Sequence, residues 1–267
     1  MQQTPKSQPS IPQFSDLPAP LFFRYDEFDA QSHHSAHAHA WGQLNYSSHG
    51  VMQLEIEGQR FISPPSYAVW IPPHAIHSAY NRHSVVYRSV YRSVYLDMPL
   101  CAELPQQPCS VMMNDILKAI LNNFAERDVQ IPRTAADQRL GAVLLDQLHA
   151  AAVEHSYLPY ACSAPTSFVV DSLRAQPGNT DTLATWAQRV FVSERTLARQ
   201  FVRETGISFG EWRQRLRFLT AIERLETAQS IKTIAFDLGY SSPSAFISMF
   251  QRHAQCTPEH YRRQRCN

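Results

Sequence analysis

Three histidines and one glutamine have a spacing that suits either metal binding or recognition of a small molecule. His37, His39 and Gln43 follow the order His-x-His-x3-Gln, and His77 lies in a later Pro-x-His-x2-His segment. If residues 37–39 form a strand, alternation places His37 and His39 on one face, as joint ligation of a metal requires. The set lacks a carboxylate, an anionic ligand that helps to hold a dication. We therefore favour a pocket with no metal or other cofactor, and keep a divalent ion held by His37, His39 and His77 as the alternative.

Aromatic residues near these histidines extend the predicted pocket. Their flat apolar surfaces suit a small planar molecule, although filling of a hydrophobic core explains any single one of them equally well. The residues assigned to the pocket are His37, His39, Trp41, Gln43, Tyr46, Trp70 and His77.

An internal repeat near the C-terminal end forms the second pattern. Leu183–Phe201 and Ile231–Phe250 match at three positions 48 residues apart and at three further positions 49 residues apart. Each copy has an alanine before a turn and a serine after it, which is typical of a helix-turn-helix whose second helix is capped by the serine. The N–H groups at such a helix start favour phosphate oxygens. One such unit usually indicates packing alone, but two copies in an arginine-rich segment indicate DNA binding.

Two kinds of domain would position these groups. Short alternating segments from about Leu21 to Met98 predict a small antiparallel barrel or sandwich. Helices are expected over Ser110–Asp128 and from Thr134 to about His155, either to cover the β-domain or to pair with a second chain. A long helix over Phe209–Ala228 would hold the two repeats at a spacing that suits successive major grooves, about 34 Å.

The predicted fold class is therefore α+β multidomain. An N-terminal antiparallel β-barrel with a helical hairpin precedes an all-α domain of two helix-turn-helix units joined by the long helix. The expected boundaries are a disordered arm over 1–20, a β-domain over 21–108, a helical dimerisation or covering segment over 109–156, a linker over 157–167, and a helical domain over 168–265.

Charge is divided unevenly between these parts. Residues 1–167 contain 10 Lys and Arg against 14 Asp and Glu, a net charge of −4, whereas residues 168–267 contain 14 against 9, a net charge of +5. A basic, arginine-rich part favours a polyanionic partner. The five cysteines form no CxxC pair, the chain starts without a secretory signal, and no apolar run approaches the roughly 18 residues that span a bilayer. We expect a cytoplasmic protein with reduced thiols and no membrane partner.

Residues 168–265 resemble the DNA-binding domain of AraC/XylS-family transcription regulators. The family's Gly-Tyr/Phe-x-Ser-x-Ser-x-Phe pattern is matched from Gly239 to Phe246, and its closing Thr-Pro-x-x-Tyr-Arg from Thr257 to Arg262. Phe191 and Gln255 depart from the family, because glycine is usual in those two turns. These departures put local turn geometry in doubt more than function.

The β-rich part resembles a cupin domain. Residues 37–50 are similar to the first cupin motif, with Gln43 where glutamate is expected, and residues 72–81 are similar to the second, with His74 in place of a glycine. The same part also resembles the N-terminal domain of one AraC-family subgroup. With that subgroup the resemblance covers about residues 30–265.

The resemblance implies which side chains meet DNA. Arg195, Ala198 and Arg199 would face one major groove, where an arginine can bind O6 and N7 of guanine. The corresponding residues of the second unit are small, so that unit is expected to position the protein on the DNA backbone or to read DNA shape. The predicted DNA-binding residues are Ser193, Arg195, Thr196, Ala198, Arg199, Arg213, Arg217, Ser242, Ser244, Ala245, Ser248 and Arg252.

The function implied by the resemblance is that of a transcription regulator and not of an enzyme. Its partners would be double-stranded operator DNA, a small-molecule effector in the β-domain and a second copy of the chain, with RNA polymerase as a further candidate. One alternative is a metal-dependent cupin enzyme with a helical appendage, against which Gln43 and the arginine-rich repeat argue. Another is a constitutive DNA-binding protein whose β-domain only forms oligomers.

Overall fold

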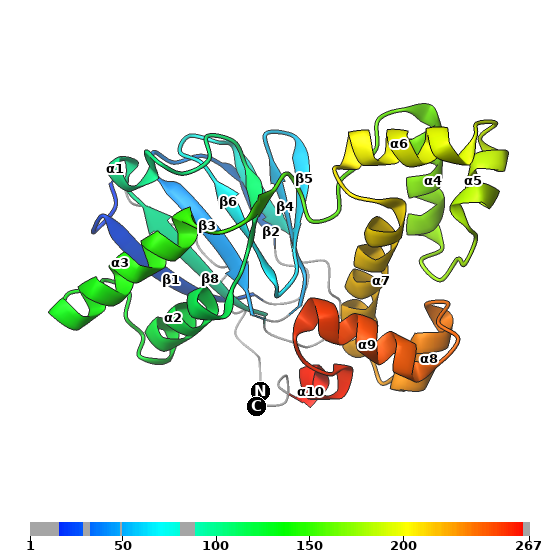
Figure 1. Ribbon diagram of the computed structural model, residues 1–267. Coiled ribbons are helices and arrows are strands. Elements are labelled where there is room, and N and C mark those ends of the chain that lie inside the picture. The colour runs from blue at the N-terminus through cyan, green and yellow to red at the C-terminus, as the bar shows by residue number, and fades with distance from the viewer. Residues whose placement is uncertain (1–15, 29–32, 49, 81–88, 264–267) are drawn as a thin grey trace, which may run out of the picture. The chain divides into compact units, whose positions relative to one another are not determined.

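The computed structural model describes residues 16–28, 33–48, 50–80 and 89–263. The chain divides between Ser156 and Tyr157 into two compact units, the first rich in strands and the second helical (Figure 1). None of the described helices combines the length and the apolar character that crossing a membrane requires. Most of the predicted disordered arm lies outside the described residues.

The strands of the first unit form two antiparallel sheets. The larger sheet has the order β1-β8-β3-β6-β9-β10, namely Leu21–Phe28, Ser89–Leu96, Gly42–Ser47, Tyr67–Ile71, Cys109–Met112 and Val153–Glu154. The smaller sheet has the order β2-β7-β4-β5, namely His33–His37, His77–Tyr80, Met52–Ile56 and Gln59–Ser63. Among the described strands no ladder joins the two sheets, so the antiparallel domain is confirmed but a closed barrel is not formed.

One face of the larger sheet packs against two helices, α2 (Asp115–Glu126) and α3 (Ala135–His149). Phe23 and Val94 of neighbouring strands are fully buried there with Phe124 of α2. Figure 1 shows both helices lying along this sheet. The helical segment therefore covers the β-domain, which is one of the two roles predicted for it.

The opposite face of the larger sheet is partly apolar and partly polar. Val69 packs with Leu54 of the smaller sheet in an apolar cluster. Gln43 and Asn45 of β3 and Ser93 of β8 are also buried, and alternation places them on the face opposite to the helix-covered core. The interior of the first unit therefore contains a buried group of hydrogen-bonding side chains.

Both helix predictions in the first unit were wrong at one end. The first helix begins at Asp115, because Ser110 lies in β9 and pairs with Val69 of β6. The second helix ends at His149, and Val153–Glu154 pairs with β9 instead of extending it. A short helix, α1 (Met98–Cys101), lies between β8 and β9. Pairing with strands that are distant in the sequence prevailed over the local helical pattern.

The described part of the second unit is entirely helical. Its helices are α4 (Ala164–Ala175), α5 (Leu183–Arg189), α6 (Glu194–Thr205), α7 (Phe209–Leu225), α8 (Ile231–Asp237), α9 (Pro243–Ala254) and α10 (Pro258–Arg263). From α5 to α9 each helix starts at a serine or threonine whose side-chain oxygen accepts a hydrogen bond from the backbone N–H three residues later. These caps satisfy N–H groups that a helix start leaves unpaired.

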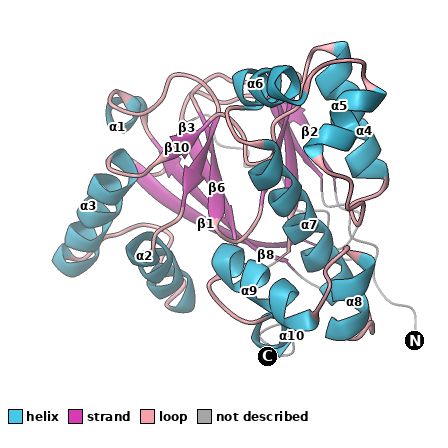
Figure 2. Ribbon diagram, turned by 45° about the vertical axis from the view of Figure 1, so that its right-hand side comes forward, coloured by secondary structure: helices cyan, strands magenta, loops and turns pink. Residues whose placement is uncertain are grey.

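Helix α7 forms the centre of the second unit. Trp212, Phe218 and Ile222 on this helix are fully buried, and α6, α8 and α9 pack against it. Figure 2 shows α7 running between the group of α4 to α6 and the group of α8 to α10. Its 17 residues correspond to a rod about 25 Å long. The helix ends at Leu225, three residues before the predicted Ala228.

The predicted linker, 157–167, is instead an ordered part of the second unit. Tyr157 is fully buried, and its carbonyl oxygen accepts a hydrogen bond from Nη1 of Arg215 at 3.1 Å. The carbonyl oxygen of Pro159 accepts a second bond from Nε1 of Trp212 at 2.9 Å. The two prolines of this segment, Pro159 and Pro165, stiffen the chain.

Candidate nucleic-acid interface and ligand pocket

The two sequence repeats have the same backbone geometry at their turns. After each turn a backbone N–H, at Val192 and at Tyr240, donates to the carbonyl oxygen five residues earlier at 3.0 Å. The preceding residue in each copy is left-handed, with φ of +57° at Phe191 and +78° at Gly239. The repeat in the sequence is therefore a repeat of helix-turn-helix structure.

The surroundings of these two left-handed residues differ. A Cβ at Gly239 would lie 2.3 Å from the carbonyl oxygen of Gly178, so only glycine fits there. The side chain of Phe191 is 95% exposed, and the cost of this residue is backbone strain of about 1–2 kcal/mol. The departure from glycine at Phe191 thus leaves the turn intact.

Helix α6 presents its predicted base-reading positions to solvent. Ser193 caps the helix by accepting a hydrogen bond from the N–H of Thr196 at 3.1 Å. Arg195 and Arg199 are exposed and Ala198 is half-buried. The two arginines lie four residues apart, so they share one face of the helix.

Helix α9 presents a surface of small side chains at the corresponding positions. Ser242 caps it by accepting a hydrogen bond from the N–H of Ala245 at 3.3 Å. Ser244, Ala245 and Ser248 are exposed, as is Arg252 farther along the helix. The first two turns of this helix therefore offer only hydroxyl and methyl groups to a partner.

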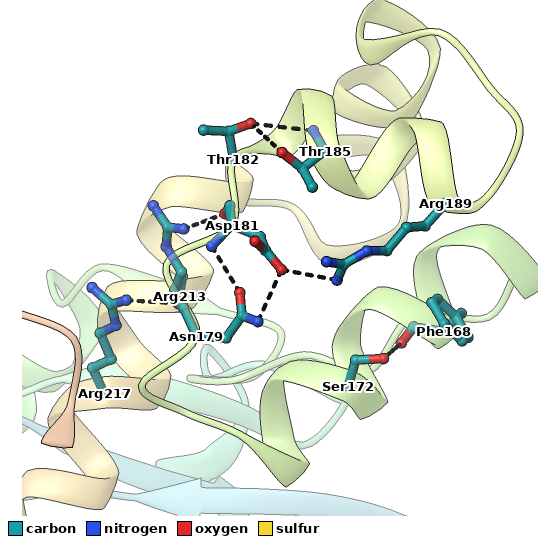
Figure 3. Close-up of polar contacts among 9 residues, drawn as sticks. All are labelled: Phe168, Ser172, Asn179, Asp181, Thr182, Thr185, Arg189, Arg213 and Arg217. Atoms are coloured by element: carbon teal, nitrogen blue, oxygen red, sulfur yellow. Dashed lines mark hydrogen bonds and ion pairs between the residues drawn. The ribbon is translucent and has the colours of Figure 1, made fainter.

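Two arginines that we predicted as DNA contacts bind the protein's own backbone. Arg217 is 5% exposed, and its guanidinium donates to the carbonyl oxygens of Pro177 at 3.2 Å and Asn179 at 2.8 Å. Arg213 is half-buried and donates from Nη1 to the carbonyl oxygen of Asp181 at 2.8 Å. Figure 3 shows both guanidinium groups directed at the segment before α5. Burial places Arg217 out of reach of a phosphate, so that prediction was wrong, and Arg213 has a structural role.

The segment held by these arginines fixes the start of the first helix-turn-helix. The carboxylate of Asp181 accepts a hydrogen bond from Nδ2 of Asn179 at 3.0 Å and pairs with Nη1 of Arg189 at 2.8 Å (Figure 3). The hydrogen bond from Asn179 and the nearby Arg189 charge lower the pKa of Asp181. Sequence reasoning missed this network, because charge counting cannot separate arginines that face DNA from those that face the backbone.

In the first unit the three predicted histidines come together. His37 ends β2, His77 begins β7, and His39 lies just before β3. One ring nitrogen from each residue lies within 4.8 Å of the other two. The ring centroid of His77 is 4.3 Å from that of His37 and 4.9 Å from that of His39. His77 is buried and the other two residues are half-buried, so the cluster is partly accessible to solvent.

Each of the three rings faces a backbone carbonyl oxygen with Nδ1. The acceptors are Ser35 at 3.0 Å for His37, Trp41 at 2.8 Å for His39 and Ala75 at 2.9 Å for His77. A carbonyl oxygen can only accept, so Nδ1 carries the proton of each neutral ring and Nε2 keeps its lone pair. Burial lowers the pKa of His77 to about 3 and also lowers the pKa of His39, which keeps these two rings neutral.

Gln43 connects the histidines to the buried polar group. Its Oε1 lies 2.8 Å from Nε2 of His39, and its Nε2 donates to Oδ1 of Asn45 at 2.6 Å and to Oγ of Ser93 at 3.4 Å. Asn45 and Ser93 were not predicted. Alternation from Gln43 along β3 could have found Asn45, whereas Ser93 requires the register of β8 against β3.

The aromatic residues assigned to the pocket divide between the two faces of the larger sheet. Trp41 stacks on His39 with ring centroids 4.6 Å apart, and Tyr95, which was not predicted, meets His39 edge-on at 6.0 Å. Tyr46 and Trp70 instead lie in the core between the sheet and its covering helices. Their assignment to the pocket was wrong.

A separate open recess of 410 Å³ lies in the first unit. Glu57, His74, Gln106 and His155 are among the residues that line it, and no residue assigned from the sequence to the pocket is among them. The recess and the histidine cluster are linked through the backbone, because the N–H of His74 donates to the carbonyl oxygen of His39 at 2.8 Å.

Comparison with protein families gives two matches that together cover most of the chain. Residues 186–264 match a helix-turn-helix domain family. Residues 19–156 match the AraC-like ligand binding domain family.

The chain is also similar to individual regulators and to solved structures. The HTH-type transcriptional regulator NimR of Escherichia coli is 30% identical over 225 residues, which are 84% of this chain and 81% of NimR. The regulatory protein SoxS of Salmonella typhimurium is 37% identical over 94 residues, 35% of this chain and 85% of SoxS. Among solved structures, ToxT from Vibrio cholerae aligns with 93% of this chain and 100% of its own, at 10% identity and a TM-score of 0.39.

Proposed function

Because this chain belongs to the AraC family of DNA-binding transcription regulators, we propose that it reads operator DNA mainly through α6 and responds to a small molecule held by the histidines of its ligand-binding domain. The family and the relatives are regulators, so the chain is not the metal-dependent enzyme that we considered. A ligand-binding domain also disfavours a constitutive DNA-binding protein.

The geometry of the helical unit carries the proposal. Helices α6 and α9 both pack against α7, lie toward opposite ends of it in Figure 1, and expose the faces predicted to meet DNA. A rod of about 25 Å, widened by the helices packed against it, suits two successive major grooves about 34 Å apart. The capped starts at Ser193 and Ser242 would meet phosphates through backbone N–H groups, and Arg252 would add a cation.

The two helices would contribute differently to sequence recognition. Arg195 and Arg199 can each form paired hydrogen bonds to O6 and N7 of a guanine. Ser244, Ala245 and Ser248 can offer a hydroxyl bond or contact a thymine methyl group. The first helix-turn-helix would therefore supply most of the base readout, and the second would position the protein on the DNA backbone.

The effector would bind beside the histidine cluster. Trp41 and Tyr95 provide flat apolar surfaces, while Gln43 and His77 provide polar groups at the buried end. This combination suits a small planar molecule that forms hydrogen bonds. The effector would regulate DNA binding by binding the DNA-competent and the incompetent state with different affinity.

We propose that the regulator acts in the cytoplasm and has further partners there. We propose that the chain forms a homodimer, supported by Ile116 of α2 and Val143 of α3, which remain 50% and 42% exposed. RNA polymerase would be the partner of the DNA-bound protein. Light scattering of the wild type and of an Ile116→Glu/Val143→Glu variant tests the dimer surface, and an unchanged mass would remove these helices from it.

Genome-wide mapping of bound DNA, followed by titration of the full-length protein on a mapped site, tests the proposed function. We expect the logarithm of the affinity to fall linearly with the logarithm of the salt concentration. We also expect the mapped site to bind at least about 1,000-fold more tightly than a scrambled duplex. Equal affinity for both duplexes would contradict sequence-specific regulation.

A further inference from the structure

The hydrogen bonds around His37, His39 and His77 do more than hold the rings in place. All three Nδ1 atoms are bound to backbone carbonyl oxygens, at 2.8 to 3.0 Å. Metal-ligating histidines characteristically donate one ring N–H to a carbonyl or carboxylate, which fixes the tautomer and leaves the other nitrogen for the ion. Three rings oriented in this way leave three Nε2 lone pairs in one cluster.

Two of these Nε2 atoms lack a suitable partner within the described part of the chain. Nε2 of His77 accepts no hydrogen bond within the described residues. The residue is only 3% exposed, so water cannot readily take the place of a partner. Nε2 of His39 lies 2.8 Å from Oε1 of Gln43, so two acceptors face each other without a proton when the ring is neutral. A buried polar atom without a partner is costly, and a cation between these lone pairs would remove both costs.

We propose that His37, His39 and His77 bind one divalent transition-metal ion of the zinc class, with Oε1 of Gln43 as an additional oxygen ligand. The histidines would then form a metal site in place of the metal-free pocket that the sequence favours. Imidazole nitrogens suit zinc, nickel, copper and iron, whereas magnesium and calcium prefer oxygen ligands. Nitrogens bound to zinc at about 2.0–2.1 Å in a tetrahedral site lie about 3.4 Å apart. Ring nitrogens that now lie within 4.8 Å of one another would therefore approach by up to about 1.4 Å.

The ligand set also indicates what the ion would do. Three neutral imidazoles and an amide leave the charge of the ion uncompensated, so an anionic or lone-pair donor is favoured in a fifth coordination position. A carboxylate or phenolate on the effector would fill that position beside Trp41 and Tyr95. The binding of the metal stands by itself, while its part in regulation rests on the proposed function.

Titration of the full-length protein with Zn²⁺ or Co²⁺, after removal of metal by a chelator, tests the site. We expect one equivalent per chain in calorimetry, and for Co²⁺ the visible absorption of a tetrahedral nitrogen-ligated ion. His77→Ala should weaken binding at least 100-fold. His149→Ala, which removes an exposed histidine from α3 of the same unit, should leave it unchanged.

A gain-of-affinity variant guards against misfolding as an explanation for lost binding. Gln43→Glu replaces the amide oxygen with an anionic ligand and should bind the metal at least tenfold more tightly. Absence of binding in both the wild type and Gln43→Glu would overturn the proposal, as would full binding by a His37→Ala/His39→Ala/His77→Ala variant. Stoichiometric metal that leaves operator affinity unaltered, with or without effector, would keep the site and remove its role in regulation.

Discussion

The two helix-turn-helix units share a backbone but differ in chemistry. Turn hydrogen bonds, left-handed residues and serine caps recur 48 or 49 residues apart. On this common frame α6 carries exposed Arg195 and Arg199, while α9 carries exposed Ser244 and Ser248. Packing and capping therefore preserve each helix-turn-helix, whereas the outward positions are free to take different roles. Four experiments test this difference between the two copies.

The largest effect is expected at the turn of the second helix-turn-helix. Gly239→Ala should lower the free energy of unfolding by about 2–5 kcal/mol, because a Cβ would meet the oxygen of Gly178 at 2.3 Å in a left-handed residue. Gly206→Ala is the matched control, since Gly206 has φ of +75° but nothing within 4 Å of a Cβ, and should cost about 1 kcal/mol. Urea titrations measure both values. Equal losses would show that close packing does not distinguish Gly239.

Substitutions on the two reading helices should separate their contributions to specificity. Arg199→Ala should weaken binding to the mapped site by about 1–3 kcal/mol and relax the preference at one base pair. Ser244→Ala/Ser248→Ala should cost less than about 1 kcal/mol, because single neutral hydrogen bonds are worth little net. Fluorescence anisotropy at fixed salt measures both. If Arg199→Ala weakens specific and random DNA equally, Arg199 contacts a phosphate.

The two helix-turn-helix copies should also lose stability to acid in different pH ranges. Oε2 of Glu204 on α6 accepts hydrogen bonds from the N–H groups of Cys162 and Ser163 at 3.0 Å and from the Thr166 hydroxyl. Burial raises the pKa of Glu204, but these bonds outweigh it and lower the pKa to about 2. The stability contributed by the carboxylate is therefore present above about pH 4.5 and lost as the pH falls toward 2.

The residue of the second helix-turn-helix that corresponds to Glu204 is His253, 49 positions later. Burial against Phe218 lowers the pKa of His253, so stability declines as the pH falls below the ordinary histidine value of about 6.5. Glu204→Gln should cost about 1–3 kcal/mol at pH 7 and remove the step below pH 4.5. His253→Gln should reduce only the decline that begins near pH 6.5, to which His39 and His77 also contribute. Urea midpoints between pH 7 and pH 3 test this order, and one shared transition in all three proteins would contradict it.

The smallest effect is expected at the exposed turn of the first helix-turn-helix. Phe191→Gly should raise the free energy of unfolding by about 0.5–1 kcal/mol, because glycine relieves a left-handed residue whose ring is 95% exposed. Thermal unfolding measures the gain, and operator binding should not change. A loss of operator affinity would instead place the ring in contact with DNA.

The sequence predicted those features that depend on local signals. The repeat, the serine caps at Ser193 and Ser242, and the helix between the two units follow from spacing within short segments. The convergence of His37, His39 and His77 was also predicted. Each of these features needs only helix or strand periodicity and the capping preferences of serine.

The errors concern features that depend on distant contacts. Alternation from Gln43 already places Tyr46 on the other face of β3, a signal that the aromatic character of Tyr46 obscured. The position of Trp70 requires the register of β6 against β3, and the burial of Arg217 requires the path of the chain before α5. Register and burial arise from tertiary packing, so a single sequence without an alignment does not supply them.

The small side chains on α9 have a consequence for the pattern of bases that genome mapping should recover. If one helix selects bases and the other mainly follows the sugar-phosphate chain, each bound copy will leave a lopsided motif with most of its information content in one half. Such a motif has a direction. The protein would then lie on each promoter in one orientation, which fixes the end that it presents to the transcription start.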